Sequence, residues 1–539
     1  MSGPTWEPDI VFGTLLPSVH RTAEENLGLG YLASVLRDAG YAVKIVDAWL
    51  ERLPAEKMVT RMLEAGVPGV IGISAYISNM KEALEVVRIV KTRVPDVPLL
   101  VGGPGPTFHP EAFLDAGFDV VVRGEAEELI EPLCRSLISG MALDPGIPNL
   151  VYSDREGNVV KTPLRPVTAR LDQYPCPARD TLALAVHRRS LAHLATSRGC
   201  RGNCLFCSVS SFHHTTGNPK WRGRSIGSIG DELEYLARLG VRHVRIVDDS
   251  FIEPPRGRGW AGDLADEIVR RGLAFRFRCS LRADRIDDDL MAQLVRMGVF
   301  AVSCGVENFA PSALRRMEKT ATAEQNLRAL SVLRNHGVYV QAGLILFDHE
   351  TTVDELLVNL EVLEAHDWIV APGFASEMFA ATGTRYTARL RQLGVLERDQ
   401  GRHGNLTSTF ANRRVKAVHA ALQKWHGAHA ELLYMAADPI GTPKALESDE
   451  LQSFHRLHSQ LWKRGLRFFR QTLELVDARG FCTKDLEELA EEQVNMSRSW
   501  RNKFSRKLAE EYRRANLNYD AAENPFLSIR SGMGVTSPC

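Results

Sequence analysis

The stretch SRGCRGNCLFC, residues 197–207, spaces three cysteines as C-x3-C-x2-C. Thiolates bind zinc and iron–sulfur clusters, and a complete protein shell around either one usually has four ligands. A set of three leaves one metal position open to a substrate or cosubstrate, and we expect the metal ligands to be Cys200, Cys204 and Cys207. The alternative that stays open is a zinc site with a distant fourth ligand, for example His213 or His214.

The composition is typical of a multidomain protein that acts on small molecules. The chain has 539 residues, too many for a single core, so we expect about two to four domains. Its 66 Lys and Arg balance its 66 Asp and Glu, which argues against a general nucleic-acid binder or a polybasic membrane surface. The cysteines outside the triplet are scattered, and the sequence has neither a secretory leader nor an uninterrupted apolar run of about 18 residues. We therefore expect a soluble cytoplasmic protein.

Apolar runs alternate with helical patterns over the first 140 residues. The runs cover 9–15, 41–48, 69–75, 98–103 and 118–124, and they are typical of buried parallel strands. The alternation predicts a doubly wound α/β sheet, which binds ligands beyond the carboxyl ends of its strands. This edge would carry Thr14, the segment 74–78, VGGPGPTFHPE (101–111) and RGEAEE (123–128). Tight turns that bind no ligand are the alternative for these glycine-rich loops.

A second α/β region follows a predicted hairpin at 149–162 and a proline-rich connector at 171–180. Its candidate strands are 193–197, 243–249, 275–281, 301–307, 339–346 and 368–379. Six such units without a second glycine fingerprint predict a partial TIM-type barrel, whose active site lies at the carboxyl ends of the strands. Besides the cysteine loop, those ends carry Asp248, Asp249, Arg282, Glu307 and Phe347. Beyond about residue 400, long amphipathic patterns predict a C-terminal helical domain.

The cysteine triplet resembles the signature of the radical S-adenosylmethionine (SAM) enzymes, C-x3-C-x-aromatic-C, with Phe206 in the aromatic position. Further stretches resemble successive barrel segments of that family: VDDSF (247–251), SLRAD (280–284), GVENFAPSALRRMEK (305–319) and the GT of ATGTRY (381–386). The resemblance implies a [4Fe–4S] cluster on the three cysteines, with SAM on its open iron. It also implies SAM contacts at Phe206, Asp248, Arg282 and Glu307.

The first domain resembles the cobalamin-binding domain that precedes the barrel in one branch of that family. The similar stretches are NLGLGYLASVLRDAGYAVKIVDA (26–48), GISAY (72–76), LLVGGPGPTFHPEAF (99–113) and VVRGEAEE (121–128), so the resemblance spans roughly residues 9–390. It implies cobalamin contacts at Thr14, Ser74, Tyr76, Ser78, Gly102, Gly103, Thr107, Gly124 and Glu125. The predicted domains are a cobalamin-binding domain at 1–145, a hairpin and connector at 146–190, a radical SAM barrel at 191–395 and a helical domain at 396–539.

Three features depart from the family's pattern. The chain has LFDHETT (346–352) where many relatives have a Gly-Pro-Gly turn, which leaves the roles of Asp348 and His349 open. Gly105 takes the place of the usual histidine of the glycine loop. The motif D-x-H-x-x-G is absent, and its nearest counterpart contains His20, so we expect cobalamin to bind without a protein histidine on cobalt. Tyr76 or water would then face the lower side of the cobalt.

The resemblance implies a cobalamin-dependent radical SAM methyltransferase. One SAM would be cleaved to a 5′-deoxyadenosyl radical, and a second would supply, through methylcobalamin, a methyl group to a carbon of a small natural-product substrate, free or tethered to a carrier protein. A low-potential electron donor such as flavodoxin or ferredoxin is the expected partner. The alternatives are a non-methylating cyclisation or rearrangement catalyst and a non-catalytic cobalamin- or redox-sensing protein. No residue is assigned a catalytic role at this stage.

Overall fold

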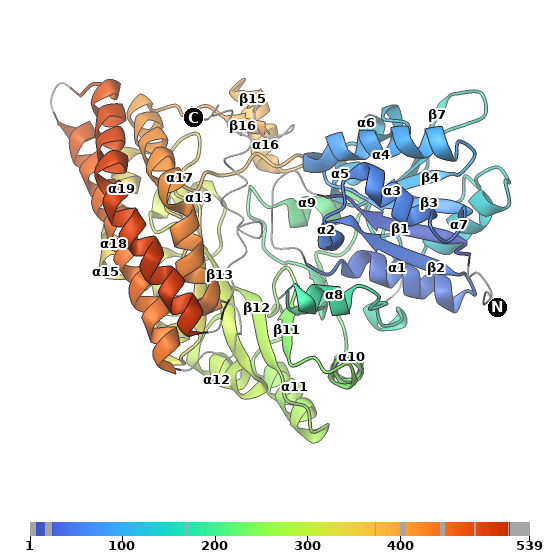
Figure 1. The fold of residues 1–539 in the computed structure, drawn as a ribbon, viewed down its shortest axis with the longest axis horizontal. Helices are drawn as coiled ribbons and strands as arrows, with labels where there is room; N and C mark the ends of the chain where they lie inside the picture. Colours follow the sequence, from blue (N-terminus) through green and yellow to red (C-terminus); the bar gives the residue numbers. More distant parts are fainter. Residues whose placement is uncertain are drawn as a thin grey trace.

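The computed structural model describes residues 7–16, 24–167, 170–188, 190–371, 373–398, 406–441, 448–478, 481–515 and 517. His20 therefore lies outside the described residues. An N-terminal α/β domain, a central barrel-like sheet and a C-terminal group of long helices follow one another across the molecule (Figure 1). Within the described residues, no helix combines the length and apolar composition that a membrane crossing requires.

The N-terminal sheet has seven strands in the order β2-β1-β3-β4-β5-β6-β7. Its parallel strands are β1 (Ile10–Thr14), β2 (Val43–Asp47), β3 (Val70–Ser74), β4 (Leu99–Gly102) and β5 (Val120–Val122). The five predicted strands and their parallel arrangement are confirmed. The predicted hairpin is confirmed as β6 (Leu150–Ser153) and β7 (Val159–Lys161), and it joins this sheet antiparallel to β5.

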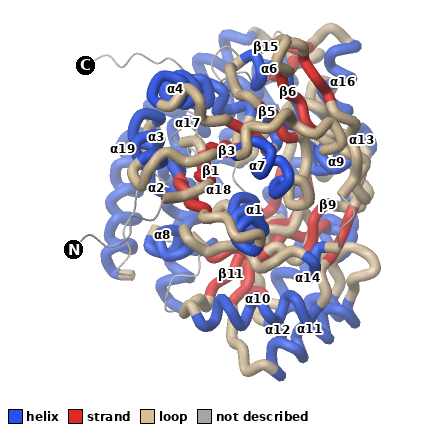
Figure 2. The backbone as a smooth tube through the Cα atoms, turned by 90° about the vertical axis from the view of Figure 1, so that its right-hand side faces the viewer, coloured by secondary structure: helices blue, strands red, loops and turns tan. Residues whose placement is uncertain are grey.

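Helices cover both faces of this sheet because successive side chains of its buried strands point to opposite sides. On β1, Ile10 and Phe12 pack with α1 (Leu27–Asp38) and α7 (Ile130–Ile138), while Val11 packs on the other side. The second face is covered by α3 (Ala55–Leu63), α4 (Met80–Arg93) and α6 (Pro110–Asp115). In Figure 2, β1 and β3 lie between α4 and α1. The short elements of this domain are α2 (Ala48–Glu51), η1 (Ile77–Asn79) and α5 (Pro104–Phe108).

The central sheet has five parallel strands in the order β14-β13-β12-β11-β8. They are β8 (Ala192–Leu194), β11 (His243–Ile246), β12 (Arg276–Arg282), β13 (Val299–Glu307) and β14 (Tyr339–Leu344). The predicted sixth strand at 368–379 is reduced to single bridges, Gln341 to Val370 and Phe347 to Glu377. A proline–glycine pair in the middle of that segment explains this, because proline lacks a ladder donor and glycine has no side chain to pack.

Helices surround the central sheet, and short elements form its rim. The main helices are α10 (Ile226–Arg238), α11 (Arg258–Arg270), α12 (Asp288–Met297), α14 (Ala323–Asn335) and α15 (Val353–Ala365). The shorter elements are η2 (Leu171–Gln173), α8 (Leu182–His187), α9 (Ser208–Thr215), η3 (Ala283–Arg285), α13 (Pro311–Arg316) and α16 (Arg385–Gln392). Two antiparallel pairs complete the region: β9 (Ser197–Gly199) with β10 (Trp221–Gly223), and β15 (Leu396–Arg398) with β16 (Leu406–Ser408).

The predicted C-terminal helices are confirmed as α17 (Arg413–Gly441), α18 (Ser448–Asp477) and α19 (Thr483–Arg514). They pack on one another, and α18 also packs on α15 of the barrel, on the side away from the N-terminal domain (Figure 1). The fully buried ring of Phe374 fills the junction with the barrel, among Trp425, Trp462 and Phe469. These aromatic residues therefore form the core of the junction between the barrel and the helices.

Candidate functional site

The cysteine loop lies between β9 and α9 at the rim of the central sheet. Gly199, which ends β9, has a φ of 88°, and a Cβ at this position would lie 2.1 Å from the carbonyl oxygen of Lys220. Only glycine fits there, which explains its place directly before Cys200. The loop is held from outside by two backbone hydrogen bonds: the N–H of Leu205 donates to Met317 at 2.9 Å, and the carbonyl of Leu205 accepts from Tyr386 at 3.0 Å.

All three cysteines are free and half-buried. The Sγ of Cys200 accepts the N–H of Gly202 at 3.2 Å, donates to Oε1 of Glu253 at 3.3 Å and lies 4.0 Å from Nη1 of Arg282. Burial, assisted by Glu253, raises the pKa of Cys200 to about 11, although Gly202 and Arg282 counteract it. Burial likewise raises the pKa of Cys204 and of Cys207. Metal binding would therefore displace protons from these thiols.

The surroundings of the thiols fit an anionic thiolate-held cluster. Lys319 and Arg282 both act to lower the pKa of Cys204, and the backbone N–H groups of Val209 and Ser210 do so for Cys207. Cations and N–H donors around sulfur are what a negatively charged iron–sulfur cluster requires.

The proposed fourth ligand of a zinc site is engaged elsewhere. His213 faces Glu125 and Asp249, and His214 is exposed. Among the described residues, no three Cys, His, Asp or Glu side chains converge closely enough to hold a single metal ion. The donor set fits a cluster of several irons better than a four-coordinate zinc ion.

Asp248, expected to contact SAM, has a carboxylate that is fully engaged by the protein. It accepts hydrogen bonds from the backbone N–H of Thr196 and the hydroxyl of Ser197, both at 2.6 Å, and Nη1 of Arg256 lies 3.5 Å away. The side chain is buried, and burial raises the pKa of Asp248. In the structure, Asp248 joins β11 to the start of the cysteine segment.

Glu307 adopts an unusual backbone conformation at the carboxyl end of β13. Its φ of 66° lies in the left-handed region, which costs a non-glycine residue roughly 1–3 kcal/mol and is often found at functional sites. The carboxylate lies over Gly305 and Gly343 and pairs with Nζ of Lys319 at 2.9 Å. Burial lowers the pKa of Lys319, but Glu307 and Cys204 more than offset it, so the pKa is raised. A carboxylate and an ammonium thus flank the cysteine loop.

The structure brings most of the expected cobalamin contacts to one edge of the first sheet. Gly103, with a φ of 104°, packs against the backbone of Ala75, and a Cβ at Gly105 would lie 2.7 Å from the backbone of Tyr76. The hydroxyl of Thr107 donates to Gly103 at 2.8 Å and accepts the N–H of Gly124 at 2.9 Å. These contacts join the loops that follow β3, β4 and β5. The group at this edge comprises Ser74, Tyr76, Ser78, Gly102, Gly103, Thr107 and Gly124.

Tyr76 and Thr14 differ in their availability to a ligand. The side chain of Tyr76, next to β3, is 49 % exposed. Thr14, at the end of β1, is buried; its hydroxyl donates to Asp47 at 2.7 Å and accepts the N–H of Trp49 at 3.3 Å. Since β1 and β3 flank the point where the strand order reverses, a ligand is expected between their ends. Tyr76 is thus exposed at this edge, and Thr14 supports the turn into α2.

Glu125, also expected at the cobalamin edge, points to the barrel. Its carboxylate pairs with Arg198 and Arg222 and accepts from Nδ2 of Asn218 at 3.1 Å. Burial raises the pKa of Glu125, but His213 and the two arginines outweigh it, so the pKa falls to about 2. The carboxylate is therefore committed to a contact between domains.

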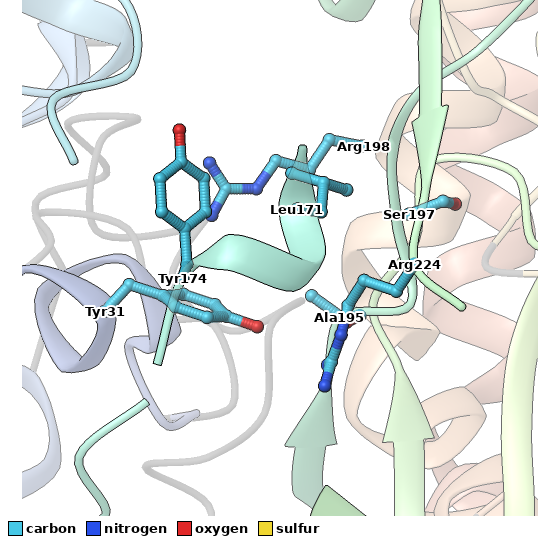
Figure 3. A pocket seen from close by; sticks show the side chains of 7 residues that line it. All are labelled: Tyr31, Leu171, Tyr174, Ala195, Ser197, Arg198 and Arg224. Carbon is cyan, nitrogen blue, oxygen red and sulfur yellow. The ribbon is translucent and has the colours of Figure 1, made fainter. Parts of the chain in front are cut away.

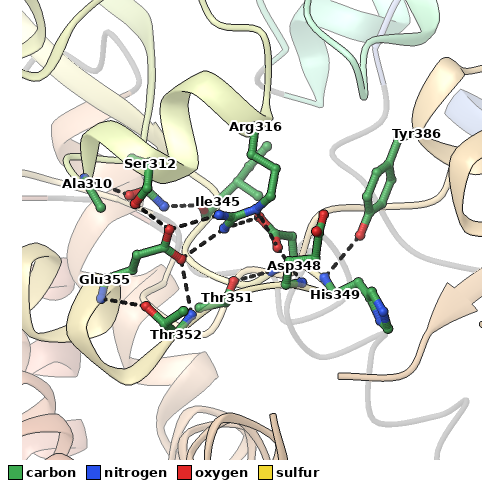
Figure 4. A network of polar contacts seen from close by, with 12 residues as sticks. Ala310, Ser312, Arg316, Ile345, Asp348, His349, Thr351, Thr352, Glu355 and Tyr386 are labelled. Carbon is green, nitrogen blue, oxygen red and sulfur yellow. Dashed lines mark hydrogen bonds and ion pairs between the residues drawn. The ribbon is translucent and has the colours of Figure 1, made fainter. Parts of the chain in front are cut away.

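The segment LFDHETT, whose role the sequence left open, belongs to a polar network on the rim (Figure 4). Arg316 lies between two carboxylates, with Nη2 2.8 Å from Asp348 and Nη1 2.8 Å from Glu355. The backbone N–H of His349 donates to the hydroxyl of Tyr386 at 3.3 Å, and its ring contacts the carbonyl of Thr409. Asp348 and His349 thus fix this loop against α13 and α16.

Two neighbours of the cysteine loop were not identified from the sequence alone. Lys319 lies in the stretch 305–319, which resembles a barrel segment of the family. Nothing in the local sequence indicates that its side chain lies near Glu307 and Cys204. Glu253 is fully buried and lies next to Cys200, and its position two residues beyond VDDSF was the only available signal. Arg282, at the end of β12, was predicted to contact SAM, and its Nη1 lies 3.4 Å from Oε1 of Glu253.

Comparison with known families gives two matches that agree with this geometry. The chain matches the B12 binding domain over residues 19–133 and the radical SAM superfamily over residues 194–360. It is 29 % identical over 352 residues to an uncharacterized methyltransferase of Pyrococcus horikoshii, covering 64 % of this chain and 74 % of the relative. It is 27 % identical over 370 residues to an anaerobic magnesium-protoporphyrin IX monomethyl ester cyclase of Rubrivivax gelatinosus, covering 65 % of each chain, which is less than two thirds of that relative.

A solved structure shares the whole architecture. The cobalamin-dependent S-adenosylmethionine radical enzyme OxsB, with aqua-cobalamin and S-adenosylmethionine bound, superposes with a TM-score of 0.74. The alignment covers 98 % of this chain and 84 % of that one at 18 % identity. At this identity the likeness concerns the fold, which includes the helical C-terminal region as well as the two α/β domains.

Proposed function

We propose that this chain, which joins a B12 binding domain to a radical SAM domain, transfers a methyl group from SAM by way of cobalamin to a carbon of a small molecule. The observation that carries the proposal is the position of the three half-buried thiols. They lie on a rim loop that leads directly into α9, the helix that packs on α5 of the first domain. A cluster there would lie next to the glycine-rich loop expected to hold cobalamin.

The residues around the loop have separate tasks in this proposal. Cys200, Cys204 and Cys207 would hold a [4Fe–4S] cluster, which supplies one electron to SAM when both are bound. Glu307 and Lys319 offer a carboxylate and an ammonium of the kind that orient the amino and carboxylate groups of SAM. Phe206 packs on an apolar group around Tyr386 and Met378, which would shield that face from water.

Cobalamin would bind at the edge formed by Ser74, Tyr76, Gly102, Gly103 and Thr107. Close backbone packing at Gly103 leaves no room for a side chain at that position, so the backbone there is open to close approach by a corrin ring. Tyr76 is the half-exposed side chain there and would face the lower side of the ring. An external donor such as flavodoxin or ferredoxin would supply the electron, and the substrate would be a natural-product intermediate, free or tethered to a carrier protein.

Anaerobic purification followed by iron, sulfide and corrinoid analysis tests the cofactor part of the proposal. We expect about four irons and one corrinoid per chain. Cys204→Ala should lose the cluster and all 5′-deoxyadenosine formation, while Cys176→Ala, at an exposed cysteine of the connector, should retain both. Full iron content in Cys204→Ala, or bound zinc in the wild type, would contradict the assignment.

SAM carrying a trideuterated methyl group tests the reaction itself. We expect 5′-deoxyadenosine after reduction and the label first on the corrinoid and then on the product. The cyclase relative favours a second candidate, a non-methylating radical reaction, which would form 5′-deoxyadenosine and leave the product unlabelled. A sensor protein would bind cobalamin and form no 5′-deoxyadenosine.

A further inference from the structure

We propose that a set of charged residues between the first domain and the barrel, here called the Glu125 clamp, sets the position of the cluster relative to the corrin. The clamp comprises Glu125, Glu127, Arg198, Arg222 and His213. This inference rests on the proposed function. It assigns positioning roles to residues that would not themselves ligate the cluster or the corrin. The clamp joins the loop that follows β5 to both ends of the cysteine loop.

The first attachment is Arg198, two residues before Cys200. Its guanidinium pairs with Glu125 and, at 2.6 Å, with Glu127. It also lies over the rings of Tyr31 and Tyr174, at 5.2 and 5.7 Å from their centroids (Figure 3). Four partners on one guanidinium leave it a single orientation. The start of the cysteine loop is thereby fixed to α1, to the connector and to the loop after β5.

The second attachment is His213, six residues after Cys207 on α9. Its Nδ1 lies 3.5 Å from Glu125 and its Nε2 3.9 Å from Asp249. Asp249 in turn accepts the backbone N–H of Gly199 at 2.9 Å, next to Cys200. His213 therefore bridges the first domain and the residue that starts the cysteine loop. Both ends of the loop thus depend on the same carboxylate, that of Glu125.

Close packing prevents the two domains from sliding past each other at the clamp. Gly124 has a φ of 78°, and a Cβ there would lie 2.6 Å from Cγ2 of Thr216, just beyond α9. The rings of Phe108 and Phe212 meet edge to face with centroids 6.4 Å apart. Phe108 belongs to the glycine-rich loop region expected at cobalamin, so α9 contacts two of the loops at the corrin edge.

Such a clamp matters because the reaction joins groups held by different domains. A misplacement of about 1 Å in a bound pair of reactants can cost roughly 100-fold in rate. The connector alone would leave the distance between the two cofactor sites variable. Buried ion pairs are directional and would fix one relative orientation of the two domains. The clamp residues therefore control geometry without taking part in bond breaking.

The experiment uses the full chain loaded with both cofactors and needs no substrate. The double variant Glu125→Gln/Glu127→Gln is compared with Glu64→Gln, which removes an exposed carboxylate of the same domain that pairs with Arg61. The readouts are iron and corrinoid content, 5′-deoxyadenosine formation, and the broadening of the Co(II) electron paramagnetic resonance signal by the reduced cluster. That broadening depends on the distance between the two centres.

We expect the double variant to retain both cofactors and to form 5′-deoxyadenosine within about twofold of the wild type. Its Co(II) signal should lose the single broadened shape of the wild type, because the distance between the cluster and the cobalt is no longer fixed. Glu64→Gln should match the wild type in every readout. An unchanged Co(II) signal in the double variant would overturn the clamp. A wild type without iron or corrinoid would overturn the proposed function instead.

A milder variant keeps the test decisive if the double variant fails to fold. His213→Gln retains a polar side chain of similar reach and removes the imidazole that lies between Glu125 and Asp249. We expect the same change in the Co(II) signal at smaller amplitude. The exchange Arg198→Glu with Glu127→Arg should restore the broadened Co(II) signal relative to Arg198→Glu alone; failure of this rescue would count against the clamp.

Discussion

The barrel meets its two neighbouring domains through opposite chemistries. Toward the first domain, Arg179 of the connector pairs with Glu25 at 2.6 Å and with Glu232 of α10 at 2.5 Å, and all three side chains are at most 2 % exposed. Toward the C-terminal helices, Phe374 stacks on Phe469 at 5.8 Å and packs edge-on to Trp462. One junction is made of buried charges and the other of aromatic rings.

The difference indicates two distinct tasks. Burying a charge is costly, and a buried ion pair adds little stability compared with an apolar contact, but it is demanding in geometry. Aromatic packing contributes stability through buried area and tolerates small shifts. We infer that the charged junction fixes the orientation of the first domain relative to the barrel, while the aromatic junction keeps the helical domain attached.

The largest expected effect comes from removing the shared cation of the charged junction. Arg179→Met leaves Glu25 and Glu232 buried without that partner, so we expect a loss of about 3–5 kcal/mol in unfolding free energy. Denaturant titration followed by circular dichroism measures it. A loss below about 1 kcal/mol would show that this junction is hydrated and would remove the contrast between the two.

Lowering the pH should change the stability of the chain in opposite directions through two histidines, one at each junction. Burial lowers the pKa of His458, in the helical domain, to about 4, so the unfolded chain takes up its proton first and stability falls between about pH 6.5 and 4. At pH 5 this amounts to about 2 kcal/mol. His458→Phe should therefore reduce the loss of stability between pH 7 and pH 5, measured by denaturant titration at each pH.

His213, at the charged junction, supplies the opposite case. Burial lowers its pKa, but Asp249 and Glu125 more than offset this, so the pKa is raised. The stability that protonated His213 contributes is complete below the pKa that this residue has in the unfolded chain. It is lost as pH rises through the pKa that His213 has in the folded chain. His213→Gln should therefore make the chain more sensitive to acid than the wild type. Equal pH profiles for the two variants would contradict the assignment.

A smaller effect tests how tightly the aromatic junction is packed. A Cβ at Gly465 of α18 would lie 2.4 Å from Cε1 of Phe374 and 2.9 Å from Cη2 of Trp425. Gly465→Ala should therefore destabilise the chain by about 1–2 kcal/mol despite the better helix propensity of alanine. In α17, Gly427→Ala meets nothing within 4 Å and should stabilise by about 0.5–1 kcal/mol. Thermal unfolding of the two variants measures both changes in stability. Stabilisation by both substitutions would mean that the side chains at the aromatic junction are loosely packed.

The smallest effect is expected where the same kind of ion pair lies at the surface. Arg37 and Asp180 pair at 2.6 Å, but their side chains are 37 % and 34 % exposed. Arg37→Met should change the unfolding free energy by less than about 1 kcal/mol. Added salt should reduce this difference further, whereas it should leave the effect of Arg179→Met largely unchanged.

Sequence patterns predicted the elements well because their signals are local. The five parallel strands of the first sheet, the cysteine loop and the C-terminal helices follow from apolar periodicity and spacing within short windows. The hairpin at 149–162 is confirmed, but its pairing with β5 depends on a distant strand that no local pattern indicates. The predicted strand at 368–379 was wrong, because the segment makes only isolated bridges. The SAM and cobalamin contacts stay predictions, although Asp248 and Glu125 have carboxylates engaged by Thr196, Ser197, Arg198 and Arg222.

By itself, the sequence determined the order of the domains and the grouping of three cysteines in one short loop, because strand, helix and motif signals depend on neighbours along the chain. Only the tertiary structure decided which charges meet. Glu125 and Arg198 lie more than 70 residues apart, and so do Cys204 and Lys319, so no local pattern links them. Their pairing depends on how buried charges find compensation across a domain boundary, which is a property of the packed molecule.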